Sequence, residues 1–331
     1  MVSERLRSQV LQVFKVDIRA GRTVKSGVYH LVDERNRQYC LKRMAYSKEQ
    51  LRWTERALGI VRERGFKRFS WGPLARLPGG ETFYVLTPWL TGESPSLSDR
   101  AALADCAAAL ARFHRAGRTR RIVQASARQE LGRWPTFFQS GREMLKRALA
   151  GSGPFWHSRG LRSALLPYED ELLARVERAS QRLAAADYPS LVLAARKTGS
   201  LCHGDSGPGN FVITKSGPHL IDFETLRIDL PVYDLFRMVR LTGKGTDWDF
   251  QFTGAILDGY RRISPLGRAD CDLLAGWVLF PYKAVKILRR AARTPLHEHS
   301  AAALKLECVL RQEAQIHKWA TELDHYAQGL R

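Results

Sequence analysis

Four polar residues in the second half of the chain have the types and spacing of a phosphoryl-transfer site. The stretch LCHGDSGPGNF (201–211) places Asp205 two residues after His203 and five before Asn210, and a short apolar run then ends at Asp222. Phosphoryl transfer from a nucleotide needs a carboxylate that orients the attacking hydroxyl and accepts its proton, together with hard oxygen ligands that hold a metal ion against the phosphates. The spacing therefore predicts Asp205 as the base, Asn210 and Asp222 as Mg²⁺ ligands, and ATP as the phosphoryl donor.

The residues between and beside these groups have supporting roles in the same prediction. Gly207 and Gly209 are expected to let the loop turn tightly, so that the base and the first metal ligand face one point. His203 is expected to be a structural hydrogen-bonding group rather than a proton carrier. Glu224, two residues after Asp222, is expected either to help hold the metal or to cap the loop.

A basic residue near the N-terminus completes the predicted site. Lys42, in the β-rich run QYCLKRM, is expected to bind the α- and β-phosphates. Glu55 follows 13 residues later, on the apolar stripe of a helix predicted for 47–65, and an acid there needs a partner, so it is expected to pair with Lys42. Arg43 is the alternative to the lysine, although strand alternation points it to the other face, and Glu49 is the alternative to Glu55.

Two further segments are expected to contact the nucleotide. The turn at Ser26 and Gly27 precedes a strand and would lie over the phosphates, although the chain lacks a full G-x-G-x-x-G loop. The connector from Thr87 through Trp89 to Leu90 follows an apolar run and would read the edge of the adenine through its backbone groups.

The surrounding elements predict an α+β fold with two lobes. A chain of 331 residues exceeds what one hydrophobic core usually organises. Residues 1–90 are rich in strand signals and predict a small antiparallel-sheet N-terminal lobe, ending before the turn-rich TGESPSLSD. Residues 91–331 predict a larger, mainly helical lobe, interrupted by a short β island at 201–224 that carries the site.

The net charge of +20 is unevenly distributed. A segment expected to be largely helical, 112–162, holds 12 Lys or Arg against 2 Asp or Glu. Such a segment is expected either to be a solvated basic surface or to contact polyanions. If it flanks the cleft, it disfavours a polycationic acceptor and favours an anionic or neutral one, such as a sugar or an acidic protein.

Cysteine usage and hydropathy bear on the location of the protein. The five cysteines include no CxxC pair, which fits a reducing compartment rather than a disulfide framework or a zinc site. The charged start MVSERLRSQV does not fit a secretory signal peptide, and no run reaches the roughly 18 apolar residues of a membrane span. We expect no membrane span and a cytoplasmic location.

Two sets of motifs resemble known families. HGDSGPGN with IDFE resembles the aminoglycoside phosphotransferase and choline kinase superfamily, and DLPVYDLFR, FYVLTPWLTGE and LARFHRAG are similar to the CotS-type spore coat kinase-like family. The resemblance implies a bilobal protein-kinase-like fold, ATP and Mg²⁺, and a mother-cell or spore-coat location. It also implies the roles given above for Asp205, Asn210, Asp222 and Lys42, and a structural role for Asp234 at the start of a helix.

The sequence therefore supports three functional hypotheses. The first is an ATP- and Mg²⁺-dependent kinase that phosphorylates a hydroxyl of a small molecule or of a spore-coat component. The second is a catalytically weak kinase-fold protein with a structural role in the spore coat. The third is a polyanion binder that uses the basic segment 112–162, alone or alongside catalysis.

Overall fold

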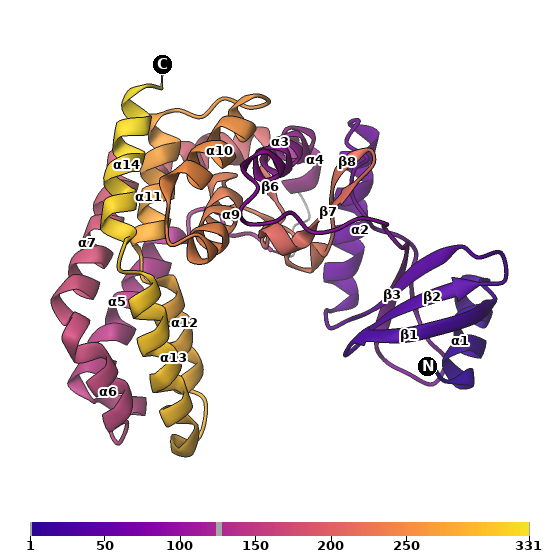
Figure 1. Cartoon of the computed structure of the whole chain (residues 1–331), viewed down its shortest axis with the longest axis horizontal. Coiled ribbons are helices and arrows are strands. Elements are labelled where there is room, and N and C mark those ends of the chain that lie inside the picture. Colours follow the sequence, from indigo (N-terminus) through magenta and orange to yellow (C-terminus); the bar gives the residue numbers. More distant parts are fainter. Residues whose placement is uncertain (1, 124–127, 331) are drawn as a thin grey trace.

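The computed structural model describes residues 2–123 and 128–330 and places a β-sheet at one end and a group of helices at the other (Figure 1). The sheet is antiparallel, with the strand order β1-β2-β3-β5-β4. Its strands are β1 (Ile18–Lys25), β2 (Val28–Asp33), β3 (Gln38–Met44), β4 (Leu74–Arg76) and β5 (Phe83–Pro88). This is the small sheet that the strand signals predicted.

The first helix, α1 (Glu4–Phe14), packs against the sheet. Val10 of α1 is buried with Leu31, Leu41 and Leu86, which come from three neighbouring strands. Because successive strand residues point to opposite faces, Leu41 faces this small core while Lys42 faces the other side of the sheet. The alternation along β3 thus directs the lysine toward the rest of the molecule.

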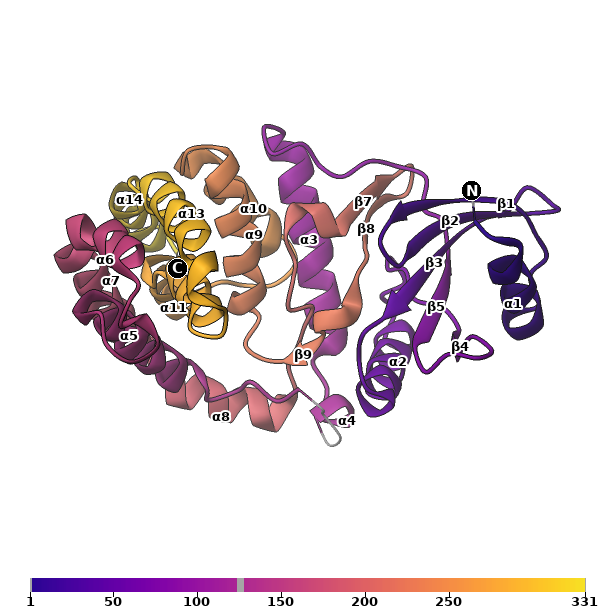
Figure 2. The same ribbon diagram turned by 90° about the horizontal axis from the view of Figure 1, so that it is seen from below.

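The helix α2 (Lys48–Glu63) begins at the predicted capping box: Ser47 Oγ accepts a hydrogen bond from Gln50 N–H, and Gln50 Oε1 accepts one from Ser47 N–H, both at 3.3 Å. Its buried residues Trp53, Leu58 and Val61 belong to the large helical core rather than to the sheet core. In both ribbon views α2 lies between the sheet and the helices (Figures 1 and 2). The helix therefore couples the two parts of the molecule.

The remainder is mainly helical, as predicted, and the connector 89–99 leads into it from β5, so the lobe boundary expected at residue 90 falls in this connector. Its core includes a group of aromatic rings in which Phe138 and Phe280 stack at 4.4 Å. The helices are α3 (Arg100–Gly117), α4 (Arg120–Val123), α5 (Trp134–Ala150), α6 (Arg159–Leu165), α7 (Glu169–Ala185), α8 (Tyr188–Thr198), α9 (Val232–Gly245), α10 (Phe250–Arg261), α11 (Arg268–Leu279), α12 (Tyr282–Ala291), α13 (His299–Gln312) and α14 (Ile316–Gln328).

The β island consists of two short antiparallel pairs. Strand β6 (Leu201–Cys202) pairs with β9 (Arg227–Ile228), and β7 (Phe211–Thr214) pairs with β8 (Gly217–Leu220). Figure 2 shows the β7–β8 hairpin between α3 and the large sheet. Hydrogen bonds join this hairpin to both flanking segments: Ser70 N–H donates to Leu220 O at 2.9 Å, and Ile213 N–H donates to Glu93 O at 2.8 Å. The island is thereby held against the N-terminal part.

The basic segment 112–162 is not one continuous helix. It includes the end of α3, α4, a stretch beside β9, α5 and α6. Glu130 N–H donates to Ile228 O at 2.9 Å, so the stretch that begins at residue 128 runs alongside the β island. Residues 124–127 of the segment lie outside the described part of the chain.

Within the described residues, no helix combines the length and the apolar character needed to cross a membrane, in agreement with the sequence.

Candidate active site

Lys42 lies at the centre of the cleft between the sheet and the β island. Its strand β3 runs between β2 and β5, where Lys42 is opposite Val28 and Val85. Its Nζ lies 2.6 Å from Oδ1 of Asp222 and 3.0 Å from Oε1 of Glu224. Burial alone would lower the pKa of Lys42, but the two carboxylates outweigh burial and raise that pKa, so the lysine is held as a cation.

Glu55 does not pair with Lys42, and the prediction that it would is wrong. Its side chain is exposed on α2, and it has no ion pair with any described residue. Helical residues advance about 100° each, so the buried arc runs from Leu51 through Thr54 to Trp53, and Glu55 lies about 40° beyond Leu51 on the solvent side. The alternative, Glu49, is exposed as well, and Glu224 is the acid that the fold brings to the lysine together with Asp222.

Asp205 and Asn210 are joined by the conformation of their loop. Asn210 Nδ2 donates to the backbone O of Asp205 at 2.6 Å and to its Oδ2 at 3.2 Å. With the amide nitrogen used in this way, the side-chain oxygen of Asn210 is the group left to accept or coordinate. The loop thus sets a carboxylate and an amide oxygen side by side.

Asp222 is brought to the same place by a backbone hydrogen bond and by an uncommon backbone conformation. Ile221 N–H donates to Asn210 O at 3.0 Å, which holds the two predicted metal ligands close together. Asp222 itself has φ 66° and ψ 57°, in the left-handed region. Such a conformation is uncommon outside glycine and is often found at functional sites, where the surrounding structure maintains it.

Gly204, rather than Gly207 or Gly209, is the glycine whose backbone conformation the loop 203–210 requires. Gly204 has φ +85°, and a Cβ there would lie 2.1 Å from Thr225 O. Gly207 has φ −64°, which other residues adopt readily, although a Cβ there would lie 2.3 Å from Leu241 Cδ1. A Cβ at Gly209 would meet nothing within 4 Å. The predicted roles of Gly207 and Gly209 in the turn are therefore corrected.

His203 supports the loop as a buried, neutral imidazole. Its Nε2 lies 2.8 Å from Ile221 O, to which it donates, and its Nδ1 accepts from Asp205 N–H at 3.2 Å. Only the neutral ring can donate at one nitrogen and accept at the other. Burial lowers the pKa of His203, in agreement with this state. The ring therefore links Asp205 to the strand end that carries Asp222.

Asp234, in the first turn of α9, holds the start of the loop through hydrogen bonds from the loop backbone. It accepts hydrogen bonds from His203 N–H at 2.6 Å, Gly204 N–H at 2.8 Å and His114 Nε2 at 2.9 Å. Burial alone would raise the pKa of Asp234, but the hydrogen bond and charge of His114 outweigh it and lower that pKa. Its structural role, implied by the family resemblance, agrees with these contacts.

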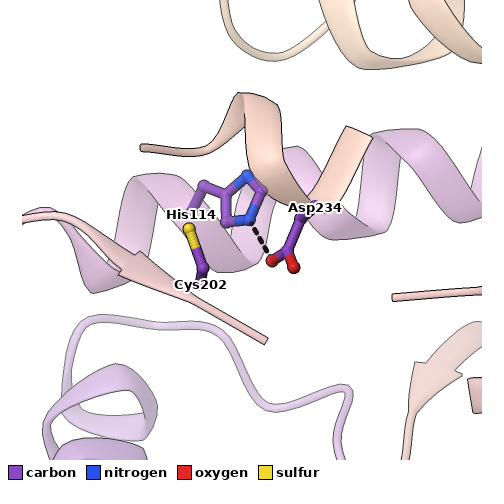
Figure 3. A group of neighbouring side chains, drawn as sticks. All are labelled: His114, Cys202 and Asp234. Atoms are coloured by element: carbon purple, nitrogen blue, oxygen red, sulfur yellow. Dashed lines mark hydrogen bonds and ion pairs between the residues drawn. The ribbon is translucent and has the colours of Figure 1, made fainter. Parts of the chain in front are cut away.

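Cys202 lies beside this pair, and the potential ligand atoms of His114, Cys202 and Asp234 lie within 4.8 Å of one another (Figure 3). Each of these groups already has a protein partner: His114 Nδ1 lies 2.8 Å from Tyr260 OH, and Cys202 Sγ donates to Asp229 O at 3.2 Å. Burial raises the pKa of the Cys202 thiol, which makes it a poor nucleophile. We interpret the cluster as structural support for the loop.

The connector predicted to read the base lines a cavity of about 140 Å³ next to Lys42. Thr87, Trp89 and Leu90 contribute to one wall, and Ile221 and Phe223 contribute to the opposite one. Trp89 N–H already donates to Gln38 O at 2.9 Å. The cavity adjoins the carboxylates of Asp222 and Glu224, so a planar base bound there would place its phosphate chain near them.

Ser26 and Gly27 form the two-residue turn between β1 and β2 and do not line this cavity. Gly27 has φ +76°, and its O accepts a hydrogen bond from Arg43 N–H at 2.7 Å. The turn therefore lies beside the strand position of the lysine, although the side chain of Ser26 is exposed. Arg43 is also exposed, and Lys42 is the basic residue of β3 that faces the cleft.

Arg237 is a residue of the site that sequence reasoning missed. Its Nη2 forms an ion pair with Oδ1 of Asp205. Arg237 follows Asp234 by three residues, so both lie on one face of α9. Asp234 binds the backbone of the loop, and Arg237 binds the carboxylate of Asp205. This helical spacing within DLPVYDLFR was the available signal.

Comparison with known proteins agrees with this geometry. The profile of the phosphotransferase enzyme family matches residues 19–273. An aminoglycoside phosphotransferase from Alicyclobacillus acidocaldarius is 20% identical, with 93% of each chain covered and a TM-score of 0.76. A spectinomycin phosphotransferase solved with ADP and spectinomycin is 12% identical over 97% of this chain and 94% of its own, with a TM-score of 0.61. A choline kinase from Streptococcus pneumoniae is 15% identical over 94% and 98%, with a TM-score of 0.53.

These structures share the fold, and the family profile covers the sheet, the β island and the helices that support the site. The matched residues amount to well over half of the chain, and we conclude that the protein belongs to the phosphotransferase enzyme family.

Proposed function

We propose that the protein is an ATP- and Mg²⁺-dependent kinase that phosphorylates a hydroxyl group of its acceptor. The observation that carries this proposal is that Lys42 pairs with Asp222 beside a cavity large enough for a base, and that hydrogen bonds link the segment of Asp222 to Asn210 and Asn210 to Asp205. These groups come from segments up to 180 residues apart. Their convergence is what phosphoryl transfer demands of a protein.

The donor groups fit a magnesium ion and a triphosphate. Asn210, Asp222 and Glu224 offer hard oxygen ligands of the kind that Mg²⁺ takes in nucleotide sites, and Lys42 offers a cation for phosphate oxygens. When bound, Mg²⁺ would neutralise phosphate charge. Among the relatives, an amicoumacin kinase was solved with AMP-PNP and Ca²⁺, and the spectinomycin phosphotransferase with ADP. Both cases support a nucleotide here, and the amicoumacin kinase also supports a divalent cation.

The side chains of the protein would then have separate roles in the reaction. Asp205 orients the acceptor hydroxyl and accepts its proton, while Arg237 holds that carboxylate in place. His203 and Asp234 keep the loop in the required shape. Lys42 binds phosphate oxygens, either after it releases Asp222 and Glu224 or while it still contacts them.

We further infer a placement in the CotS-type group from the motifs DLPVYDLFR, FYVLTPWLTGE and LARFHRAG. This placement would make a spore-coat component or a small molecule the acceptor, and the mother-cell cytoplasm or the spore coat the location. The second hypothesis, a catalytically weak structural protein of the coat, predicts the same fold without a working nucleotide site.

The experiment that separates these hypotheses is a thermal-unfolding scan with and without ATP and Mg²⁺. A ligand at 100 times its dissociation constant adds about 2.7 kcal/mol to stability, which shifts the midpoint measurably. We expect a Mg²⁺-dependent shift in the wild type that Asp222→Ala loses and that Asp170→Ala, which removes an exposed carboxylate on α7, retains. If millimolar ATP caused no shift, the second hypothesis, a structural protein of the spore coat, would be favoured.

A further inference from the structure

A large hollow beside Asp205 is lined by more basic than acidic residues. Its volume is about 580 Å³, and its wall includes Asp205, Arg237, Tyr282 and Lys286. It is distinct from the cavity next to Lys42, with which it shares no lining residue. An acceptor whose hydroxyl reaches Asp205 from the side away from the nucleotide would occupy this hollow.

A second hollow lies next to the first, along α12. Lys286 lines both, and the second hollow, of about 490 Å³, is also lined by Lys283, Arg290 and Lys305. Helices α12 and α13, which carry these residues, run side by side (Figure 1). We call the two hollows together the α9–α12 groove.

The basic residues of the groove are spaced to share a face. Positions three and seven residues apart lie on one side of a helix. This spacing occurs in Lys283, Lys286 and Arg290 of α12, which line the groove, and in Arg237, Arg240 and Lys244 of α9, of which Arg237 lines it. Two basic faces therefore meet across Tyr282.

Several of these cations have no carboxylate partner among the described residues, although Arg237 is paired with Asp205. In the described part of the chain, Arg240, Lys283 and Lys286 form no ion pair; the nearby Glu313 is already bound to Arg175 at 2.8 Å. Burial lowers the pKa of Arg240, and burial together with the charges of Arg240 and Lys286 lowers the pKa of Lys283. Like charges held this close repel one another, and a bound anion would remove the repulsion.

Two arginines of α9 also lie against the ring of Tyr282. The guanidinium carbons of Arg237 and Arg240 lie 5.9 and 5.5 Å from the centre of the Tyr282 ring. Nε of Arg237 is buried and has no hydrogen-bond partner among the described residues. A positioned guanidinium with unused N–H groups matches the geometry of phosphate and carboxylate.

We propose that the acceptor of the phosphotransferase reaction is an anionic saccharide, whose phosphate or carboxylate groups bind in the α9–α12 groove while one of its hydroxyls lies at Asp205. This proposal rests on the proposed function. Hollows of this size suit a ligand of a few rings rather than an extended peptide. In the reaction the hydroxyl oxygen bonds to the γ-phosphorus of ATP, the bond to the ADP oxygen breaks, and the hydroxyl proton passes to Asp205.

The test measures saccharide binding in the absence of nucleotide. We would titrate the protein calorimetrically with glucose 1,6-bisphosphate and trigalacturonate, which separate the phosphate and carboxylate sources, and with maltotriose and kanamycin as neutral and cationic probes. We expect at least one anionic saccharide to bind at least tenfold more tightly than either of the other two. We expect the double variant Lys283→Gln, Lys286→Gln to weaken that binding about tenfold, corresponding to roughly 1.4 kcal/mol.

The matched control removes two exposed lysines that lie outside the groove, in Lys67→Gln, Lys318→Gln. We expect it to bind like the wild type. Equal weakening in both double variants, equal binding of maltotriose, preference for kanamycin, or no binding of either anionic saccharide at millimolar concentration would overturn the proposal. So would ATP-dependent phosphorylation of a serine-containing poly-glutamate peptide in preference to the saccharides.

Failure of the proposed function would be recognised separately. If the anionic saccharides bind in a Lys283- and Lys286-dependent way but ATP and Mg²⁺ cause no thermal shift, the groove is an anion site on a protein without a working nucleotide site. If ATP and Mg²⁺ cause the shift but the groove variant binds and phosphorylates saccharides like the wild type, the phosphotransferase stands and the placement of the acceptor in the groove is wrong.

Discussion

Nζ of Lys42 lies 2.6 Å from Oδ1 of Asp222, so the cation proposed for the phosphates and the carboxylate proposed for the metal are paired with each other. Glu224 lies on the same lysine at 3.0 Å. A nucleotide that arrives with its metal would supply a new partner to both sides of this pair at once. The arrangement predicts that nucleotide affinity depends strongly on the metal, because ATP alone would compete with two carboxylates for one lysine.

Glu224, and not Glu55, should control nucleotide binding. We expect Glu224→Gln to weaken Mg²⁺-dependent ATP binding about tenfold, because it removes a charged oxygen ligand proposed for Mg²⁺ beside Asp222. Glu55→Gln is the matched control and should leave affinity unchanged, because that side chain is exposed on α2. The dissociation constant for ATP, measured calorimetrically with and without Mg²⁺, gives the comparison. A larger effect at Glu55 would restore the pairing predicted from the sequence.

Asp205→Asn should separate chemistry from nucleotide binding. The variant keeps the shape of the side chain but removes the proton acceptor and the ion pair with Arg237, so we expect ADP formation with the acceptor to fall by about 10²- to 10⁴-fold. The thermal shift with ATP and Mg²⁺ should remain, since Asp205 is not among the residues around Lys42. Asp170→Asn serves as the control for loss of an exposed carboxylate. Turnover at the wild-type rate in Asp205→Asn would rule out Asp205 as the base.

The glycines of the catalytic loop should differ sharply in their tolerance of alanine. A Cβ at Gly204 would lie 2.1 Å from a backbone oxygen at a positive φ, so we expect Gly204→Ala to lower the free energy of unfolding by about 3 kcal/mol or more. Gly209 has open space around it, and Gly209→Ala should change that free energy by less than about 0.5 kcal/mol. Urea unfolding of the two variants makes the comparison. Similar effects of both changes would contradict the assignment of the turn to Gly204.

His203 should make the protein less stable in mild acid. Burial lowers the pKa of this imidazole in the folded protein below its ordinary value of 6.5, so below about pH 6.5 the unfolded chain binds a proton that the folded chain does not. Stability from this group is therefore present above that pH and is lost as the pH falls toward the folded-state pKa, by at most about 1.4 kcal/mol per pH unit.

The measurement is the free energy of urea unfolding at several pH values between 5 and 8. We expect His203→Gln to show a shallower decline in acid than the wild type, whatever its stability at neutral pH. His297→Gln removes an exposed histidine and should keep the wild-type slope. Parallel declines in His203→Gln and the wild type would show that this ring does not cause the acid sensitivity.

Much of the site could be predicted from sequence because its groups lie close together in the chain. The loop from His203 to Asn210 and the strand end at Asp222 are local features whose spacing already implies that they meet. The strands, the capping box at Ser47 and the apolar runs are likewise local consequences of side-chain type. These local features were sufficient to predict the sheet and the helical remainder.

The partners of these groups were decided only by the tertiary structure. Glu55 lies about 40° around α2 from the edge of the buried arc. The spacing of apolar residues alone does not define that edge to within one residue. Arg237 reaches Asp205 because the two turns of chain that carry them pack together, 32 residues apart. The basic segment 112–162 was visible in the composition and lines the hollow beside Asp205 through Arg128 and Arg133, but only the packing of α9 and α12 brings Arg237 and Lys286 to the same hollow. Local sequence determines which groups a chain offers, whereas contacts between distant segments depend on how whole elements pack, and that packing is a property of the complete core.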